Sequence, residues 1–240
     1  MKIISRLILV ILAVSTTMLT TAPSASAAGF SRPEELVVKS EFVFKNFMAD
    51  PNMAWFRDNV GKAKGILIIP QMLRGGFIVG GSGGSGVLLA RDEKTGKWSY
   101  PAFYTIGSIS LGFQIGADAS ELIFMIMTDK GLNAMLTTEF KLGGDISVAA
   151  GPVGGTAKVQ IADVLAFGRS QGAYGGISVE GAVVAPRYAW NSSYYGRDVM
   201  PYDILIKQSV TNPQADPLRA ALPPPVIKIR RRNVQTLGSI

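Results

Sequence analysis

The stretch at residues 75–91, GGFIVGGSGGSGVLLAR, constrains the fold more than any other part of the chain. Apolar triplets at 77–79 and 87–89 flank its glycines, and each triplet predicts a strand. A glycine inside a strand leaves bare backbone, which usually marks a bulge, a bend or another backbone passing close by. The sequence therefore predicts a pair of glycine-rich strands within a sheet core.

A second glycine-rich stretch, GAYGGISVEGAVVAPR at residues 172–187, aligns with the first at an offset of 95. It predicts two similar glycine-rich strand pairs that line one sheet. The first stretch also contains Gly81-x-Gly83-x-x-Gly86, the spacing of a dinucleotide fingerprint. That fingerprint needs a helix directly after it to carry the pyrophosphate. Residues 87–90 predict a strand there, so we expect no cofactor.

Composition excludes several kinds of active site. The chain has no histidine and no cysteine, which rules out Ser-His-Asp, Cys-His and histidine-based zinc chemistry. The carboxylates considered are scattered beside glycine or alanine, as turn residues are, or lie on the polar side of a strand. They are Asp118, Asp145, Asp163 and Glu180. We expect a protein that is not an enzyme, with a carboxylate-based hydrolase as a minor alternative.

The first 27 residues have the pattern of a cleaved signal peptide. Lys2 and Arg6 precede an apolar run at residues 7–14, and Ala25-Ser26-Ala27 offers a small-x-small cleavage site. The run is shorter than the ~20 residues that span a bilayer. We therefore expect a periplasmic or secreted protein whose mature chain has no transmembrane segment.

The formal net charge is +7, and much of it lies near the C-terminus. Residues 212–240 hold five bases and one acid, together with prolines that break regular structure. These features predict a Pro-rich, basic and disordered tail after a single domain at residues 28–211. Because the domain itself is close to neutral, we expect no nucleic-acid partner.

The remaining patterns predict a mixture of helices and strands. A helix is expected from Pro33, because apolar residues recur on one broad face, and a second short helix follows Pro51. This first helix either docks on the sheet or also touches lipid. Strands are expected at 62–70, 98–103, 106–115, 122–127, 164–167 and 177–184, and a turn at 191–196. The expected fold is α+β: a glycine-rich, mainly antiparallel β-sandwich or barrel-like sheet with N-terminal helices packed on it.

Several motifs resemble the SYLF domain, in the same order along the chain. They are IIPxxxRGGFIVGGSGGSGVLLAR, WSYPAFYTIGSISLGFQIG, FMIMTDKGL, KLGGDISVAAGPVG and SQGAYGGISVEG, and the resemblance covers residues 31–210. It implies a β-rich domain with N-terminal helices. Eukaryotic SYLF proteins bind phosphoinositide-rich membranes, the yeast members also bind actin, and bacterial relatives are mostly secreted. No SH3 or FYVE module accompanies the motifs, so we expect anionic headgroup binding without the eukaryotic scaffold roles.

The resemblance leads to a predicted lipid site. The candidate lipid-binding bases are Lys62, Lys64, Arg74, Arg169 and Arg187, of which Lys64, Arg74 and Arg169 lie where the family motif often has a base. Five bases at about 1 kcal/mol each give weak binding alone, so apolar insertion is also needed. The expected membrane contacts are Phe44, Phe47, Met48 and Trp55. The expected partner is an anionic phospholipid or membrane surface, and the competing hypothesis is a structural or protein-interaction module of the cell envelope.

Overall fold

The chain divides into two units, Met1–Ser31 and Arg32–Ile240. The computed structural model describes residues 32–76, 79–111, 116–154, 162–170, 173–175 and 179–224, all of which belong to the second unit. The predicted signal peptide, the tip residues Phe77 and Ile78, and the basic residues after 224 lie outside the described residues.

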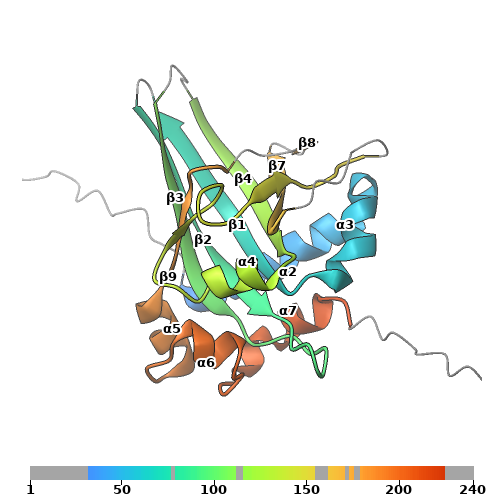
Figure 1. Ribbon diagram of the computed structural model, residues 1–240, viewed down its shortest axis with the longest axis vertical. Coiled ribbons are helices and arrows are strands. Elements are labelled where there is room, and N and C mark those ends of the chain that lie inside the picture. Colours follow the sequence, from blue (N-terminus) through green and yellow to red (C-terminus); the bar gives the residue numbers. More distant parts are fainter. Residues whose placement is uncertain are drawn as a thin grey trace, which may run out of the picture. The chain divides into compact units, whose positions relative to one another are not determined.

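Within the described residues, nine strands form one strongly curled, half-barrel sheet (Figure 1). Its order is β5-β9-β3-β2-β1-β4-β7-β6, with β8 also paired to β7. All pairs are antiparallel except β6 with β7. The strands are β1 (Gly65–Gly76), β2 (Val79–Ala90), β3 (Ala102–Leu111), β4 (Gly116–Ile126), β5 (Phe140–Lys141), β6 (Val148–Ala150), β7 (Val164–Ser170), β8 (Ala173–Gly175) and β9 (Val183–Pro186). The predicted α+β fold with a barrel-like, mainly antiparallel sheet is confirmed.

Helices cover both faces of this sheet. On one side, here called the α2 face, pack α2 (Pro33–Ala49), α3 (Ala54–Asn59), α5 (Tyr188–Tyr195) and α7 (Asp216–Ala221). On the other, the α4 face, pack α4 (Asp129–Ala134) and α6 (Pro201–Leu205). Short 3₁₀ turns, η1 (Pro51–Met53), η2 (Val60–Lys62) and η3 (Pro213–Ala215), adjoin α3 and α7. The predicted N-terminal helices on the sheet are therefore present as α2 and α3.

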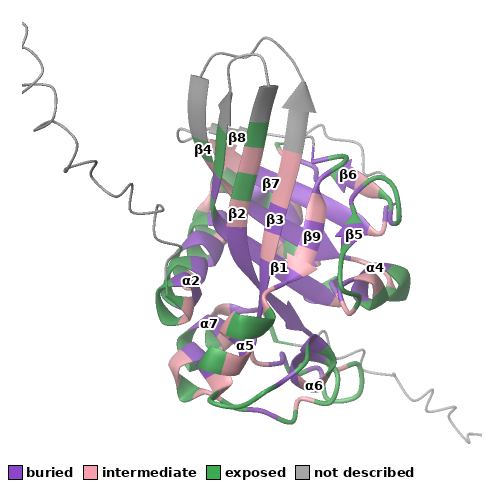
Figure 2. Ribbon diagram, turned by 90° about the vertical axis from the view of Figure 1, so that its left-hand side faces the viewer, coloured by how far each residue is buried: buried purple, intermediate pink, exposed green. Residues whose placement is uncertain are grey.

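The four long strands β1 to β4 have two different halves. In the near half (residues 65–69, 86–90, 102–106 and 122–126), side chains alternate between two buried clusters, one on each face. Ile66 and Ile68 face α2, whereas Leu67 and Ile69 face the α4 side. In the far half (residues 71–76, 79–85, 107–111 and 116–121), burial is described for residues 71–74, 81–85, 107–108 and 119–121, and most of these are exposed or half-buried (Figure 2). The prediction that residues 66–69 form a strand buried on both faces is confirmed.

A β-bulge in β1 separates the halves. The pairing register with β2 shifts by one residue between Ile68 and Gln71, next to Pro70. A Cβ added to Gly84 would lie 2.5 Å from the Gln71 carbonyl oxygen, and one added to Gly86 would lie 2.5 Å from that of Ile68. These two positions accept only glycine because the bulged backbone presses against them. The bulge and close approach predicted from the glycines are confirmed here.

Three local predictions are wrong. Residues 98–103 and 106–115 do not form two separate strands, because β3 runs unbroken through Ala102–Leu111. The turn expected at 191–196 is largely helix α5, where the buried Asn191 accepts a hydrogen bond from the Phe103 backbone N–H at 2.8 Å. The second glycine stretch does not form a strand pair, since β8 pairs with β7 while β9 pairs with β3.

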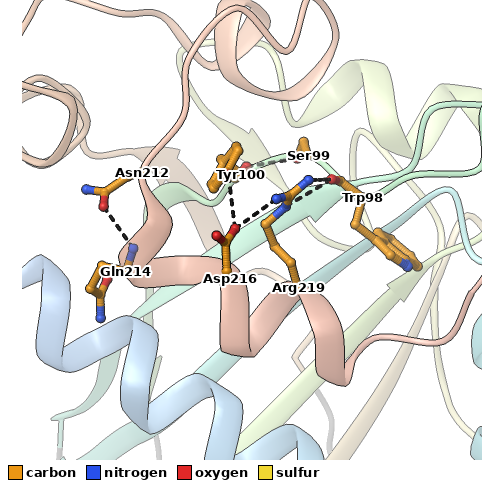
Figure 3. A network of polar contacts seen from close by, with 7 residues as sticks. All are labelled: Trp98, Ser99, Tyr100, Asn212, Gln214, Asp216 and Arg219. Atoms are coloured by element: carbon orange, nitrogen blue, oxygen red, sulfur yellow. Dashed lines mark hydrogen bonds and ion pairs between the residues drawn. The ribbon is translucent and has the colours of Figure 1, made fainter.

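The predicted disorder from residue 212 onward is also wrong for residues 213–221, which form η3 and α7. Leu218 is fully buried among residues of α2 and the sheet. Figure 3 shows the contacts that hold this segment: Arg219 donates to the Trp98 carbonyl oxygen at 2.9 Å and to Asp216 at 3.0 Å. Tyr100 donates to the same Asp216 carboxylate at 2.9 Å. Burial and these bonds offset the low helix propensity of a Pro-rich segment.

Candidate functional site: a groove between helix α2 and the sheet

A groove on the α2 face lies where helix α2 meets the far half of β1 and β4. It encloses about 380 Å³, within the range of roughly 300–1,000 Å³ typical of small-molecule sites. Its lining is mixed, with four apolar residues and five polar or charged ones. The lining residues are Lys39, Phe42, Val43, Asn46, Pro70, Gln71, Ala119, Ser120 and Glu121.

The sequence builds this groove from two local features. Helix α2 buries five apolar side chains in the core: Leu36, Val37, Val43, Phe44 and Phe47. Its Lys39, Phe42 and Asn46 follow one another at intervals of three and four residues, so they share one flank of the helix. The bulge at Pro70 then turns Gln71 toward the α2 face. The groove therefore depends on the exposed flank of α2 and on the bulge together.

The charged groups of the groove leave one cation without a partner among the described residues. Arg169 Nη2 lies 2.9 Å from Glu121 Oε1 and 2.8 Å from Oε2, directly across the β4–β7 pair. This ion pair neutralises Glu121, the one carboxylate among the described residues that line the groove. The Lys39 side chain makes no hydrogen bond or ion pair with the residues that the structure describes. An anion in the groove would therefore meet Lys39 first.

Three large apolar side chains are exposed close to the groove. Phe42 is 61% exposed, Leu73 52% and Val38 42%. Val38 and Phe42 are four residues apart on α2 and so lie on one face of the helix. Leu73 lies on the same face of β1 as Gln71, two residues further along the strand. An apolar rim of this kind on a folded surface usually marks an interaction site.

Residues 107–223 match the family model Ysc84, described as Las17-binding protein actin regulator. SH3 domain-containing YSC84-like protein 1 of Bos taurus is 34% identical over 169 residues, covering 68% of this chain and 49% of that protein. Protein YSC84 of Saccharomyces cerevisiae is 31% identical over 211 residues, covering 79% and 44%. LAS seventeen-binding protein 3 of the same yeast is 33% identical over 171 residues, covering 67% and 36%.

The chain belongs to the Ysc84/SYLF family. The resemblance drawn from the motifs is confirmed. The SYLF match ends at residue 223, so it includes α7. This chain spans half or less of the length of each of these relatives.

The five predicted bases of this SYLF chain do not lie together. Lys64 stands at the start of β1, and Arg74 lies ten residues along the same chain, about 30 Å away at strand spacing. Lys64 binds Glu93 and lies 2.7 Å from Asp129, and Lys62 donates to Asn59 at 2.7 Å. Arg74 lies on the opposite sheet face from the groove, beside Ser82, Ser108 and Glu180, with Asp118 across the β1–β4 pair.

Arg169 and Arg187 do lie on the α2 face. Arg169 is engaged by Glu121 in the groove wall. Arg187 donates to Ser85 Oγ at 2.7 Å and stacks 3.5 Å above the Trp190 ring. Burial lowers the pKa of Arg187 from its ordinary value. Both arginines thus already have protein partners, and the predicted group of five bases is not one surface.

The prediction that Phe44 and Phe47 contact a membrane is wrong. Both rings are fully buried, and each contacts Phe56 edge to face at 6.0 Å. Trp55 is half-buried and stacked on Phe167 at 6.1 Å, and Met48 packs beside the same core. The apolar stripe recognised in the sequence is the side of α2 that binds the sheet. The side chains that face outward lie off that stripe.

Lys39, Phe42 and Leu73 are the residues that sequence reasoning missed. The available signal was the position of Val38 and Phe42: two large apolar residues on α2 that do not fit its buried face. An apolar residue outside the core stripe of an amphipathic helix points to a second contact. Leu73 gave no such signal, because the bulge that orients it is not visible in the sequence.

Two of the four scattered carboxylates, Asp163 and Asp145, have structural partners, and the side chain of Asp118 lies outside the described part of the chain. Thr128 Oγ1 donates to Asp163 at 2.6 Å, and Ser147 adds bonds from its N–H and hydroxyl at 3.0 and 2.8 Å. The Thr128 hydrogen bond, followed by those of Ser147, lowers the pKa of Asp163 to about 2. Asp145 accepts from the Lys141 N–H at 2.7 Å, and Glu180 is exposed. Among the described residues, no three His, Cys, Asp or Glu side chains gather at a metal-binding distance.

Within the described ranges, none of the helices has both the length and the apolar character needed to span a bilayer.

Proposed function

We propose that this SYLF protein is a non-enzymatic module that binds anionic phospholipid at a membrane surface, with the α2 groove as its contact. One observation carries the proposal: Lys39, unpartnered among the described residues, shares a groove with Phe42, and Leu73 and Val38 stand exposed beside it. A cation beside exposed apolar side chains suits a ligand that has an anionic head and an apolar tail.

The energies fit reversible binding. Burying the exposed parts of Val38, Phe42 and Leu73 contributes about 1 kcal/mol each, roughly half of what full burial of such a side chain contributes. Lys39 contributes about 1 kcal/mol at an anionic surface. The sum of about 4 kcal/mol gives only millimolar affinity. The four bases at 228–232 would add about 4 kcal/mol and bring the affinity near micromolar.

The cellular setting is part of the same proposal. The first 27 residues have the charge and apolar pattern of a secretion signal, which supports a periplasmic or secreted protein that meets phospholipid headgroups. The absence of catalysis is supported by the printed names of the relatives, which describe binding and actin regulation. It is also supported by the structural bonds that occupy Asp163 and Asp145.

Co-sedimentation with vesicles tests the proposal. The protein should pellet with phosphatidylglycerol-containing vesicles, less so in high salt, and should stay in solution with pure phosphatidylcholine. Lys39→Glu should reduce the pelleted fraction several-fold. Lys45→Glu is the matched control on the same helix, because Lys45 is held by Glu41 at 2.5 Å and lies outside the groove. Equal loss from both variants, or equal pelleting with both vesicle types, would contradict the groove.

The apolar half of the contact has its own control. Phe42→Ser and Leu73→Ser should weaken pelleting, whereas Met200→Ser should not, although Met200 is 55% exposed before helix α6. A chain ending at Pro224 separates the basic residues from the groove without disturbing α7. It should bind more weakly but keep its dependence on Phe42.

A protein partner is the second candidate, since the yeast relative is named for binding LAS seventeen. An apolar peptide with an acidic residue could occupy the same groove. In that case vesicles would not pellet the protein, and an envelope partner would be captured by the unaltered chain but not by Phe42→Ser.

A further inference from the structure

A row of uncharged residues, two of them glycines, crosses the far half of the sheet on the α2 face. Ala119, Leu73, Gly83, Gly107 and Val183 stand directly beside one another on β4, β1, β2, β3 and β9. We call these five residues the bare row. Ala119, Leu73 and Gly83 are exposed, and Gly107 and Val183 are half-buried. The row therefore carries no charge, and bare backbone at its two glycines lies between the side chains of Leu73 and Val183.

The glycines of the bare row are not required by packing inside the protein. A Cβ on Gly83 would meet nothing closer than the Ile106 carbonyl oxygen at 3.7 Å, and one on Gly107 would lie 3.6 Å from that of Ser82. Both distances are ordinary contacts. Glycine is less favourable in a strand than alanine or valine. Among the described residues, no side chain closes over these two glycines, so their backbone can accept a ligand from outside.

The row leads out of the groove. Ala119 belongs to both, and the groove also holds Lys39. Four inter-strand spacings separate β4 from β9, which makes the row about 19 Å long. One leaflet of a bilayer contributes about 15 Å of hydrocarbon. An acyl chain whose anionic head sits at Lys39 could thus lie along the whole row.

We propose that the bare row holds one acyl chain of a bound anionic amphiphile, so that the protein withdraws a lipid from the membrane and does not only dock there. This inference rests on the proposed function and names its ligand class: an acyl chain with one anionic headgroup. Lys39 binds the head, Phe42 lies beside the start of the tail, Leu73 contacts the tail within the row, and Gly83 and Gly107 let the tail lie against the backbone.

Native mass spectrometry with 1-palmitoyl-lysophosphatidylglycerol tests the inference, and vesicle co-sedimentation is run in parallel. The unaltered protein should retain the lysolipid. Gly83→Val and Gly107→Val should each lower the retained fraction about tenfold while vesicle pelleting changes less than about twofold. Neither variant should lower Tm, because valine suits an exposed strand position. Two variants on different strands guard against a local folding defect.

Ser82→Val is the matched control, since Ser82 neighbours Gly83 on the same strand but faces the α4 side. It should keep the lysolipid. If the unaltered protein pellets with vesicles but retains no lysolipid, or if Gly83→Val retains it fully, the row is not a tail site and the proposed function stands. If the unaltered protein neither pellets with vesicles nor retains the lysolipid, both the proposed function and this inference are wrong. A dimer that Gly83→Val dissociates would assign the row to self-association and overturn the inference.

Discussion

The near and far halves of β1 to β4 both contain glycines within strands, but these glycines have different surroundings in the two halves. Near-half side chains are buried on both faces between helices, whereas the far-half positions whose burial is described are mostly small and either exposed or half-buried (Figure 2). Gly86 sits at the boundary because the bulge leaves no room for a Cβ, and Gly83 sits beyond it with space to spare. A glycine in a strand can therefore serve the fold or serve a ligand, and its neighbours decide which.

The largest expected effect is on the free energy of unfolding, which should depend strongly on buried near-half side chains and little on exposed far-half ones. Phe103→Ala removes a fully buried near-half ring that contacts Tyr194 at 4.9 Å, so the free energy of unfolding should fall by about 3–5 kcal/mol. Leu73→Ala, in the exposed far half, should change it by less than about 0.5 kcal/mol. Urea denaturation of both variants measures the difference. Similar losses from both would mean that the far half is as tightly packed as the near half.

The next effect separates the two kinds of glycine. Gly86→Val places side-chain atoms against the Ile68 carbonyl and against Ile69 Cγ1, which would lie 2.7 Å from the new Cβ. It should destabilise the fold by about 1–3 kcal/mol or more. Gly81→Val, whose Cβ meets only the Ser108 carbonyl oxygen at 3.6 Å, should be neutral or stabilising. The same sign of change in both variants, read from Tm, would remove the distinction.

A smaller effect on stability is expected from Asp163, which lies next to β7 and accepts hydrogen bonds from the residues that precede α4 and β6. The pKa of Asp163 is lowered to about 2, chiefly by the Thr128 hydrogen bond, so the ionised form stabilises the folded state. That stabilisation is complete above about pH 4 and is lost as the pH falls from about 4 to about 2. Asp163→Asn should cost about 1–2 kcal/mol at pH 7.

Stability measured against pH checks this prediction. The unaltered protein should lose stability through that acid range, and the Asp163→Asn variant should show a flatter profile there. Identical slopes for the two proteins would mean that the Thr128 and Ser147 bonds do not hold the carboxylate in its ionised form. Leu73→Ala serves as a control, since it should leave the acid slope unchanged.

Much of the near half could be predicted from the sequence. Runs such as residues 66–69 and 122–126 are apolar without interruption, and this pattern indicates burial on both faces. The helix after Pro33 was also recognisable, because its core residues recur at helical spacing. Local patterns were enough to predict an element wherever its apolar residues are also its buried residues.

The remaining elements depend on contacts between distant residues. The segment 213–221 has prolines that suggest disorder, yet Pro213 and Pro217 occupy first-turn helix positions, where proline is tolerated. Its helix is fixed by Trp98, more than a hundred residues earlier in the chain. Asn191 looked like a turn residue but binds the β3 backbone.

The candidate site was predicted only in outline. The sequence pointed to α2 and to bases near the glycine-rich strands, and the structure puts a groove at that junction. It could not show that Glu121 engages Arg169, because 48 residues separate them. It also could not show that the bulge at Pro70 sets which face each far-half residue of β1 occupies, with Gln71 on the α2 face and Arg74 on the other. The sequence does not show which lysines find a partner in the fold. Lys39 could therefore not be distinguished from other surface lysines, although it has no side-chain partner in the described part of the chain.

The most direct test of the account uses the absence of cysteine from the chain. A single cysteine placed by Phe42→Cys is labelled with a polarity-sensitive nitrobenzoxadiazole dye, and its emission is recorded with phosphatidylglycerol vesicles and with phosphatidylcholine vesicles. We predict a blue shift with the anionic vesicles alone, and none for the same label at Met200→Cys. No shift at position 42, or an equal shift at position 200, would contradict the assignment of the α2 groove as the lipid contact.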